Sequence, residues 1–270
     1  MPAVALRHRG ISPRDVFVLS FPRSGNTWVR FMLAHLLLGR RPDFDDVFSR
    51  IPPVGWHRSA PPVLPDGGRL IKSHERPSWP HASSYRKAVY LVRDGRDVSI
   101  SYYHWYLRSG LYGGRFDGFL RLFLAGRLDG YGAWHEHVRS WLASAPARAD
   151  ALLLVRYEDL LAKPTEELAG IARFLGLDVS SDRAEDAVRS STVDMTRGRP
   201  LRATRARAKA APSDLRRIRG SSGQWMEVLT PRQSEMFRHV AGEVLAELGY
   251  EPQESRVASA EQGASSRSHA

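Results

Sequence analysis

Apolar residues follow two patterns along the chain. Short hydrophobic runs typical of buried strands occupy Val16–Ser20, Arg69–Lys72, Ala88–Arg93 and Ala151–Arg156. Apolar residues at helical spacing occupy Asn26–Leu38, Gly95–Leu107, Tyr131–Ala143, Lys163–Leu175, Ser181–Ser190 and Pro231–Leu248. Strands separated by helices imply βαβ units. The pattern therefore predicts a three-layer α/β fold with a central parallel sheet.

Three segments lack a core pattern. Asp43–Gly68 is rich in Pro and Gly and is predicted to be a long connection over the sheet edge. Arg197–Arg219 carries nine Arg or Lys residues, so we expect a mobile lid that closes over a bound anion. Residues 251–270 are expected to form a disordered tail, which leaves a single predicted domain over residues 1–250.

Composition narrows the possible chemistry. The chain of 270 residues has no cysteine, which excludes disulfides and thiolate catalysis and favours a cytoplasmic location. We expect neither a secretory signal nor a membrane span, because the first residues have no apolar core and no apolar run is long enough. The net charge of +11 suits nucleic acid, a small polyanion or simply a biased composition, and charge alone does not separate these.

The most informative motif follows the first predicted strand. A short loop, Arg23–Thr27, leads directly into a helix. The unpaired amides and the dipole of a helix N-terminus favour an anion such as phosphate. Compared with G-x-x-x-x-G-K-[ST], this P-loop-like segment has Asn26 in place of the lysine and a cation, Arg23, three residues earlier. We therefore do not expect hydrolysis of ATP or GTP, but we do expect the loop to bind another phosphate-like anion.

Polar residues also follow the second and third predicted strands, where ligands bind in parallel sheets. Lys72 and His74 lie at the end of the second strand. Arg93 ends the third, and Ser101 follows about two turns into the next helix, so both could reach one phosphate. The alternative is that Arg93 pairs with a neighbouring aspartate and Ser101 bonds back to its own helix.

These motifs resemble, in the same order, those of the sulfotransferases that use 3′-phosphoadenosine 5′-phosphosulfate (PAPS). Residues 21–28, FPRSGNTW, resemble Y-P-K-S-G-T-T-W, and residues 72–77, KSHERP, resemble K-T-H-x-x-P. The segments RDGRDVSISYYH, YED and RGSSGQW extend the resemblance from about Phe17 to about Tyr250. The chain is identified as similar to a cytosolic-type, bacterial-like sulfotransferase domain.

The resemblance implies how the donor is bound. Its 5′-phosphosulfate would contact Arg23, Ser24, Gly25, Asn26 and Thr27. Its adenine would contact Trp28 and Tyr157, for which packing in the core is the alternative. Its 3′-phosphate would contact Arg93, Ser101, Arg219 and Gly220. The chain departs from the family pattern R-K-G-x-x-G-x-W-K-x-x-F-T at Ile218, Met226 and Leu229, and Arg216 or Arg217 could supply the missing charge.

The resemblance also implies the chemistry. His74 would be the general base for an acceptor hydroxyl or, as second choice, an amine, and Arg23 and Lys72 would stabilise the charge that develops. The product would be adenosine 3′,5′-bisphosphate (PAP), and no metal site is expected. Two alternatives are a phosphate-loop kinase or hydrolase, which would need a lysine at Asn26, and a basic nucleic-acid-binding protein, for which no motif is present.

The acceptor is predicted less sharply. The variable segments Asp43–Gly68, Ser78–Ser84 and Leu107–Phe116 are expected to surround it. The aromatic residues of these segments favour a small aromatic or lipophilic acceptor. They are Phe44, Phe48, Trp56, Trp79, Tyr106 and Tyr112. The sequence predicts no nucleic-acid partner and does not indicate an oligomeric state.

Overall fold

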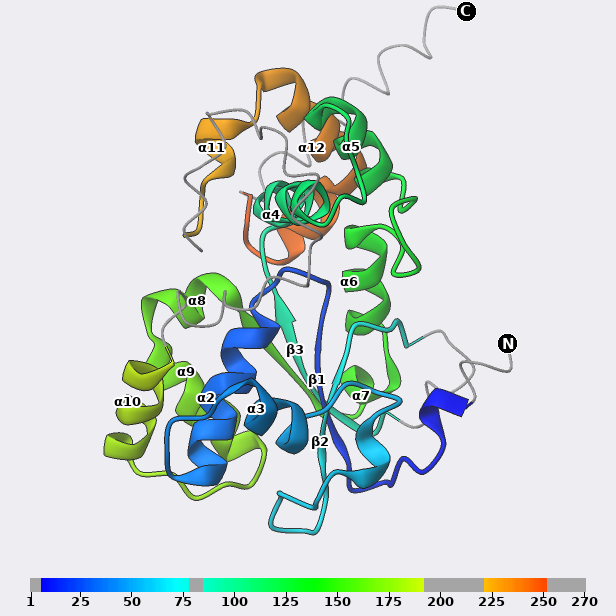
Figure 1. The fold of residues 1–270 in the computed structure, drawn as a ribbon. Helices are drawn as coiled ribbons and strands as arrows, with labels where there is room; N and C mark the ends of the chain where they lie inside the picture. Colours follow the sequence, from blue (N-terminus) through cyan, green and yellow to red (C-terminus); the bar gives the residue numbers. More distant parts are fainter. Residues whose placement is uncertain (1–5, 78–84, 192–220, 252–270) are drawn as a thin grey trace, which may run out of the picture.

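A four-stranded parallel sheet forms the centre of the protein in a computed structural model that describes residues 6–77, 85–191 and 221–251 (Figure 1). Its strands are β1 (Val16–Ser20), β2 (Leu70–Ser73), β3 (Lys87–Val92) and β4 (Leu152–Arg156), in the spatial order β2-β1-β3-β4. All three pairings are parallel, and Phe17 lies opposite Ile71 on one side and Ala88 on the other. The predicted strands are confirmed, with their ends shifted by one residue at most.

Helices cover both faces of the sheet, so successive residues of β1 enter different cores. Val16 and Val18 pack with helices α2 (Asn26–Leu38), α8 (Tyr157–Ala162), α9 (Pro164–Phe174) and α10 (Ser181–Ser190). Phe17 and Leu19 pack with α4 (Gly95–Arg108), α5 (Phe116–Leu124), α6 (Trp134–Leu142) and α12 (Pro231–Glu247). A strand buried on both faces reads as a continuous apolar run, which explains why the sequence pattern located the strands well.

Two helices that the sequence pattern did not predict follow α2 and α4 in the chain. The segment Asp43–Gly68 contains α3 (Phe44–Arg50), which begins with a reciprocal capping box between Asp43 and Asp46, and a 3-10 turn at His57–Ser59. The helix α5 follows the predicted loop Leu107–Phe116 and buries four apolar residues on one face, Phe119, Leu120, Phe123 and Leu124. Two further short helices are α7 (Ala145–Arg148) and α11 (Trp225–Val228).

The strand order places the predicted motifs at one edge. From β1 the chain passes to β2 on one side and then crosses to β3 on the other, which makes the carboxyl end of β1 a topological switch point. The loop after β1, His74 after β2, Arg93 after β3 and Tyr157 after β4 all lie at that edge. The predicted lid and the predicted tail beyond residue 251 lie outside the described residues, and the domain limits remain a prediction.

Candidate active site

The loop after β1 has an unusual backbone. Arg23 and Gly25 both have positive φ angles, 72° and 92°. At Gly25 a side chain is also excluded by space, because a Cβ atom there would lie 2.6 Å from the ring of Tyr157. The first hydrogen bond of α2 runs from the Val29 amide to the Gly25 carbonyl, 3.2 Å away. The preceding amides therefore remain available at the helix N-terminus.

The side chains of this loop divide into two groups. Arg23 and Thr27 are exposed. The Ser24 hydroxyl is buried and has no hydrogen-bond partner among the described residues. An unpaired buried hydroxyl beside an open helix N-terminus and a cation is a local arrangement that suits an anion.

Asn26 has a role that the sequence did not predict. Its side-chain amide donates to the Val18 carbonyl at 3.2 Å and to the Ser20 hydroxyl at 3.4 Å, so it points back into β1. The residue that replaces the P-loop lysine thus ties the start of α2 to the strand before it.

Arg23, Ser101 and Arg93 converge on this loop. The Arg23 Nε donates to the Ser101 hydroxyl at 3.1 Å, and the Arg93 Nη1 donates to the Arg23 carbonyl at 3.3 Å. The Ser101 hydroxyl makes no hydrogen bond to its own helix among the described residues, whereas the Ser99 hydroxyl donates to the Arg96 carbonyl. The two predicted anion sites are contiguous rather than separate.

Asp97 organises the other side of Arg93. Its carboxylate is fully buried and lies 3.8 Å from the Arg93 guanidinium. The same carboxylate accepts hydrogen bonds from the amides of Gly223 and Trp225, at 2.7 and 3.0 Å, and Arg93 donates to the Ser221 carbonyl at 3.0 Å. The alternative pairing of Arg93 with Asp97 is therefore present, and it also anchors the segment that follows Gly220.

His74 is oriented by β1. Its Nδ1 lies 2.7 Å from the Ser20 carbonyl oxygen, which can only accept. The proton is therefore on Nδ1, and Nε2 keeps the lone pair that a general base needs. The ring packs edge-on against Tyr131, with the ring centres 5.6 Å apart. The Ser20 carbonyl thus links His74 to the strand that carries the loop Arg23–Thr27.

Burial sets the protonation of Lys72, which lies within β2, and of His74, which follows it. Burial and the positive charge of Lys72 hold the pKa of His74 well below its ordinary value, so the imidazole is neutral at pH 7. Burial, Arg30 and Arg7 lower the pKa of Lys72 to about 7. Within the described chain, no hydrogen bond or ion pair holds the Lys72 ammonium group. Its charge is therefore poorly compensated.

The side chains of Trp28 and Tyr157 are buried rather than exposed at the surface. Both belong to the core beneath α2, at 7% and 4% exposure, and their ring centres are 6.2 Å apart. The Trp28 indole donates to the Ser191 carbonyl, and the Arg93 guanidinium lies over the Tyr157 ring at 4.6 Å. These contacts support packing roles, and an adenine contact from either residue remains a prediction. Arg219 and Gly220 lie outside the described residues.

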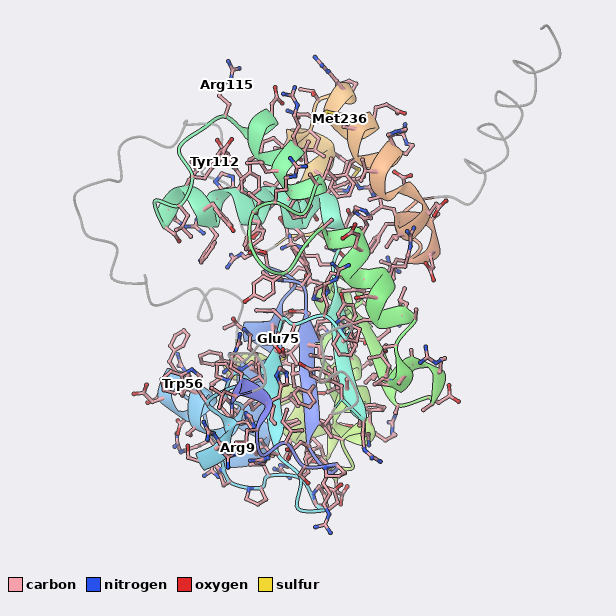
Figure 2. All side chains as sticks on the ribbon, turned by 90° about the vertical axis from the view of Figure 1, so that its right-hand side faces the viewer. Arg9, Trp56, Glu75, Tyr112, Arg115 and Met236 are labelled. Atoms are coloured by element: carbon pink, nitrogen blue, oxygen red, sulfur yellow. The ribbon has the colours of Figure 1, made fainter. Side chains whose placement is uncertain are left out.

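The aromatic residues predicted around the acceptor do not form one group. Tyr106 is buried and donates to Asp129, and Phe44 packs against Phe31. Phe48 and Trp56 form an exposed pair on the side of the molecule below the strand ends, whereas Tyr112 lies above them (Figure 2). Trp79 lies outside the described residues.

Sequence reasoning missed the supporting residues of the site. The Ser20 carbonyl contacts His74, which is 54 positions away. Asp97 was considered only as a partner of Arg93, but it also accepts from the amides of Gly223 and Trp225, and no local motif reveals these contacts. Tyr131 was assigned only to the start of a helix. Among the described residues there is no cluster of three His, Asp or Glu side chains that could hold a metal ion, and no helix is long and apolar enough to cross a bilayer.

Comparison with known proteins defines the family. A family model described as the sulfotransferase domain matches residues 13–249, and the chain therefore belongs to the sulfotransferase domain family. Sulfotransferase 1A1 of Bos taurus is 28% identical over 249 residues, covering 83% of this chain and 81% of the relative. Sulfotransferase 4A1 of Mus musculus is 28% identical over 241 residues, covering 84% and 78%. The enzyme class is that of the sulfotransferases, and these mammalian relatives give no support to the narrower bacterial-like expectation.

Solved structures share the fold. Mouse sulfotransferase SULT7A1 complexed with PAP superposes with a TM-score of 0.63 at 23% identity, covering 94% of this chain and 91% of that one. Retinol dehydratase in complex with retinol and PAP superposes with a TM-score of 0.65 at 21% identity, covering 90% and 86%. At these identities the likeness concerns the fold alone.

Proposed function

We propose that the protein transfers the sulfuryl group of PAPS to a hydroxyl or, as second choice, an amine of a small-molecule acceptor. The observation that carries the proposal is the orientation of His74: its Nδ1 proton is committed to the Ser20 carbonyl, and Nε2 remains as a base beside the anion-binding loop. Family membership and the PAP named in the solved complexes support the choice of donor.

The residues around α2 fit such a donor. The buried Ser24 hydroxyl and the buried Arg93 Nε have no partner in the described structure, and both are donors that a phosphate oxygen would satisfy. Arg23 and the first amides of α2 would hold the 5′-phosphosulfate. Arg93 and Ser101 would hold the 3′-phosphate, together with Arg219 and Gly220 from the segment outside the description.

The transfer itself needs two kinds of group. The neutral His74 would accept the proton of the acceptor hydroxyl at Nε2 while the oxygen forms a bond to sulfur. The bond between sulfur and the bridging phosphate oxygen would break, and PAP would leave. Arg23 would stabilise the charge on the bridging oxygen and Lys72 that on the sulfuryl oxygens. A preorganised donor of this kind contributes about 3 kcal/mol to stabilisation of the transition state.

The acceptor is proposed to be aromatic or lipophilic. The exposed pair of Phe48 and Trp56 supports this class, since it places two aromatic rings at the surface of the protein. Solved complexes of retinol dehydratase contain retinol and androsterone, which are small lipophilic hydroxyl compounds. A kinase-like alternative has less support, because Asn26 stands where a lysine is required and its side chain is bound to β1.

The proposal is tested by product formation. The purified protein would be incubated with PAPS and an extract of small metabolites, and new sulfated compounds would be identified by mass spectrometry. The expected result is sulfated product and an equal amount of PAP with the wild-type protein and neither with His74→Ala. Transfer of a phosphoryl group from ATP, or equal product from both proteins, would overturn the proposal.

A further inference from the structure

His137 is buried behind the site, and both of its ring nitrogens are hydrogen bonded. It lies on α6 with no exposed surface. Its Nε2 is 2.9 Å from the His74 carbonyl oxygen, and its Nδ1 is 2.9 Å from the Tyr90 hydroxyl. Since the carbonyl can only accept, Nε2 carries the proton, and the Tyr90 hydroxyl donates to Nδ1.

Neighbouring rings fix the plane of His137. Tyr90 stacks on it at a centroid distance of 5.9 Å and an angle of 22°, and Phe21 meets its ring edge-on at 5.4 Å. Burial lowers the pKa of His137 to about 4, so the ring is neutral near pH 7. A neutral ring keeps the acceptor that the Tyr90 hydroxyl uses and the donor that the His74 carbonyl uses.

Trp141 makes a matching contact from the same helix. Its indole Nε1 donates to the Glu75 carbonyl at 3.1 Å. Residues four apart lie on one face of a helix. His137 and Trp141 of α6 therefore hold the carbonyl groups of two consecutive residues, His74 and Glu75.

The segment that carries His74 depends on these two side chains. The strand β2 ends at Ser73, and neither His74 nor Glu75 makes a backbone-to-backbone hydrogen bond within the described part of the chain. The ring of His74 is held by Ser20, and its backbone by His137. Loss of the Ser20 contact would free the ring of His74, and loss of the His137 contact would free its backbone.

We propose that His137 is a positioning residue for sulfuryl transfer, which fixes the backbone of His74 by donating to its carbonyl oxygen, with Trp141 acting in the same way at Glu75. This inference rests on the proposed role of His74 as general base. A displacement of about 1 Å in a reacting group costs about 100-fold in rate. Loss of the donor should therefore lower kcat and leave nucleotide affinity unchanged, since His137 has no hydrogen bond or ring contact with any predicted phosphate ligand that the structure describes.

Two substitutions at His137 separate the hydrogen bond from the volume of the ring. His137→Leu should lower kcat about 10- to 100-fold, with affinity for PAP within about twofold of wild type. His137→Gln should recover most of that loss, because its amide can donate to the carbonyl and accept from Tyr90. If the Gln variant is as slow as the Leu variant, the hydrogen bond does not position the base.

The two buried tryptophans of α6 provide a matched control. Trp134 is as buried as Trp141, but its indole N–H has no partner among the described residues. Trp141→Phe and Trp134→Phe should lower the melting temperature by similar amounts, while only Trp141→Phe lowers kcat. Equal kcat losses in the two variants would indicate a general packing effect and would contradict the inference.

The His74→Ala background separates this inference from the proposed function. If His74 is the base, His74→Ala is inactive, and adding His137→Leu changes the residual rate by less than about twofold. Turnover by His74→Ala would defeat the proposed function itself. An inactive His74→Ala together with a fully active His137→Leu would leave the proposed function standing and overturn the positioning role alone.

Discussion

Lys72 should take up a proton when PAPS binds above neutral pH. Its pKa of about 7 reflects burial and the nearby charges of Arg30 and Arg7, with only Glu75 acting in the opposite direction. Arg30 is fixed in place by two hydrogen bonds to the Ile51 carbonyl, so it cannot turn away. A sulfuryl group beside the amine would supply the missing negative charge and restore the pKa towards its ordinary value.

The size of the effect follows from the pKa. At pH 8 a group with a pKa of about 7 is about one-tenth protonated, so binding should take up about 0.9 proton per PAPS. The direction of the pH dependence is fixed by the same reasoning. The donor binds the protonated form, so affinity is greatest below pH 7 and falls by up to about tenfold for each pH unit above it.

Calorimetry measures this proton directly. PAPS would be titrated at pH 8, without acceptor, in two buffers with different ionisation enthalpies, and the difference in observed heat gives the number of protons taken up. Lys72→Met should lose most of the uptake, and PAP, which lacks the sulfuryl group, should give less uptake than PAPS. Uptake near zero in the wild type, or equal uptake in Lys72→Met, would refute the assignment of Lys72 to the sulfuryl group.

Three further results are expected. His74→Ala should abolish turnover with PAP affinity near wild type, whereas Arg23→Ala should weaken both, and equivalent kinetics for the two variants would contradict their separate roles. Because burial lowers the pKa of His74, its base form persists in acid, and the acid limb of a profile of kcat against pH should lie below pH 6.5. An acid limb above pH 6.5 would contradict a lowered pKa. Gly25→Ala should destabilise the fold by about 1–3 kcal/mol in chemical denaturation because of the positive φ and the contact with Tyr157, and an unchanged midpoint would argue against the loop geometry.

The sequence predicted the sheet better than the helices around it. The central strands β1 and β3 are buried on both faces, so their apolar runs are continuous and easily located. The helix α5 was not predicted, although its four buried positions follow helical spacing. The helix α3 was missed because Asp43–Gly68 was predicted to be a connection from its Pro and Gly content.

The site was predictable in its position and less so in its contacts. Motifs that follow consecutive parallel strands must meet at one edge, so the proximity of His74 and Arg93 to the loop follows from their order in the chain. The partners of these groups are distant in sequence: Ser101 is 78 residues from Arg23. Such pairings depend on how the helices pack, and spacing along the chain does not encode them.

The central claim, that the loop after β1 and the residues after β3 recognise PAPS, is tested most directly by the affinity for PAP compared with adenosine 5′-phosphate and ATP. A charge-assisted hydrogen bond contributes about 1.5–3 kcal/mol, so the 3′-phosphate should increase affinity about 10- to 100-fold over adenosine 5′-phosphate. ATP should bind more weakly than PAP, and Arg93→Ala should remove the preference. Equal affinity for PAP and ATP, or a preference that survives Arg93→Ala, would contradict the account.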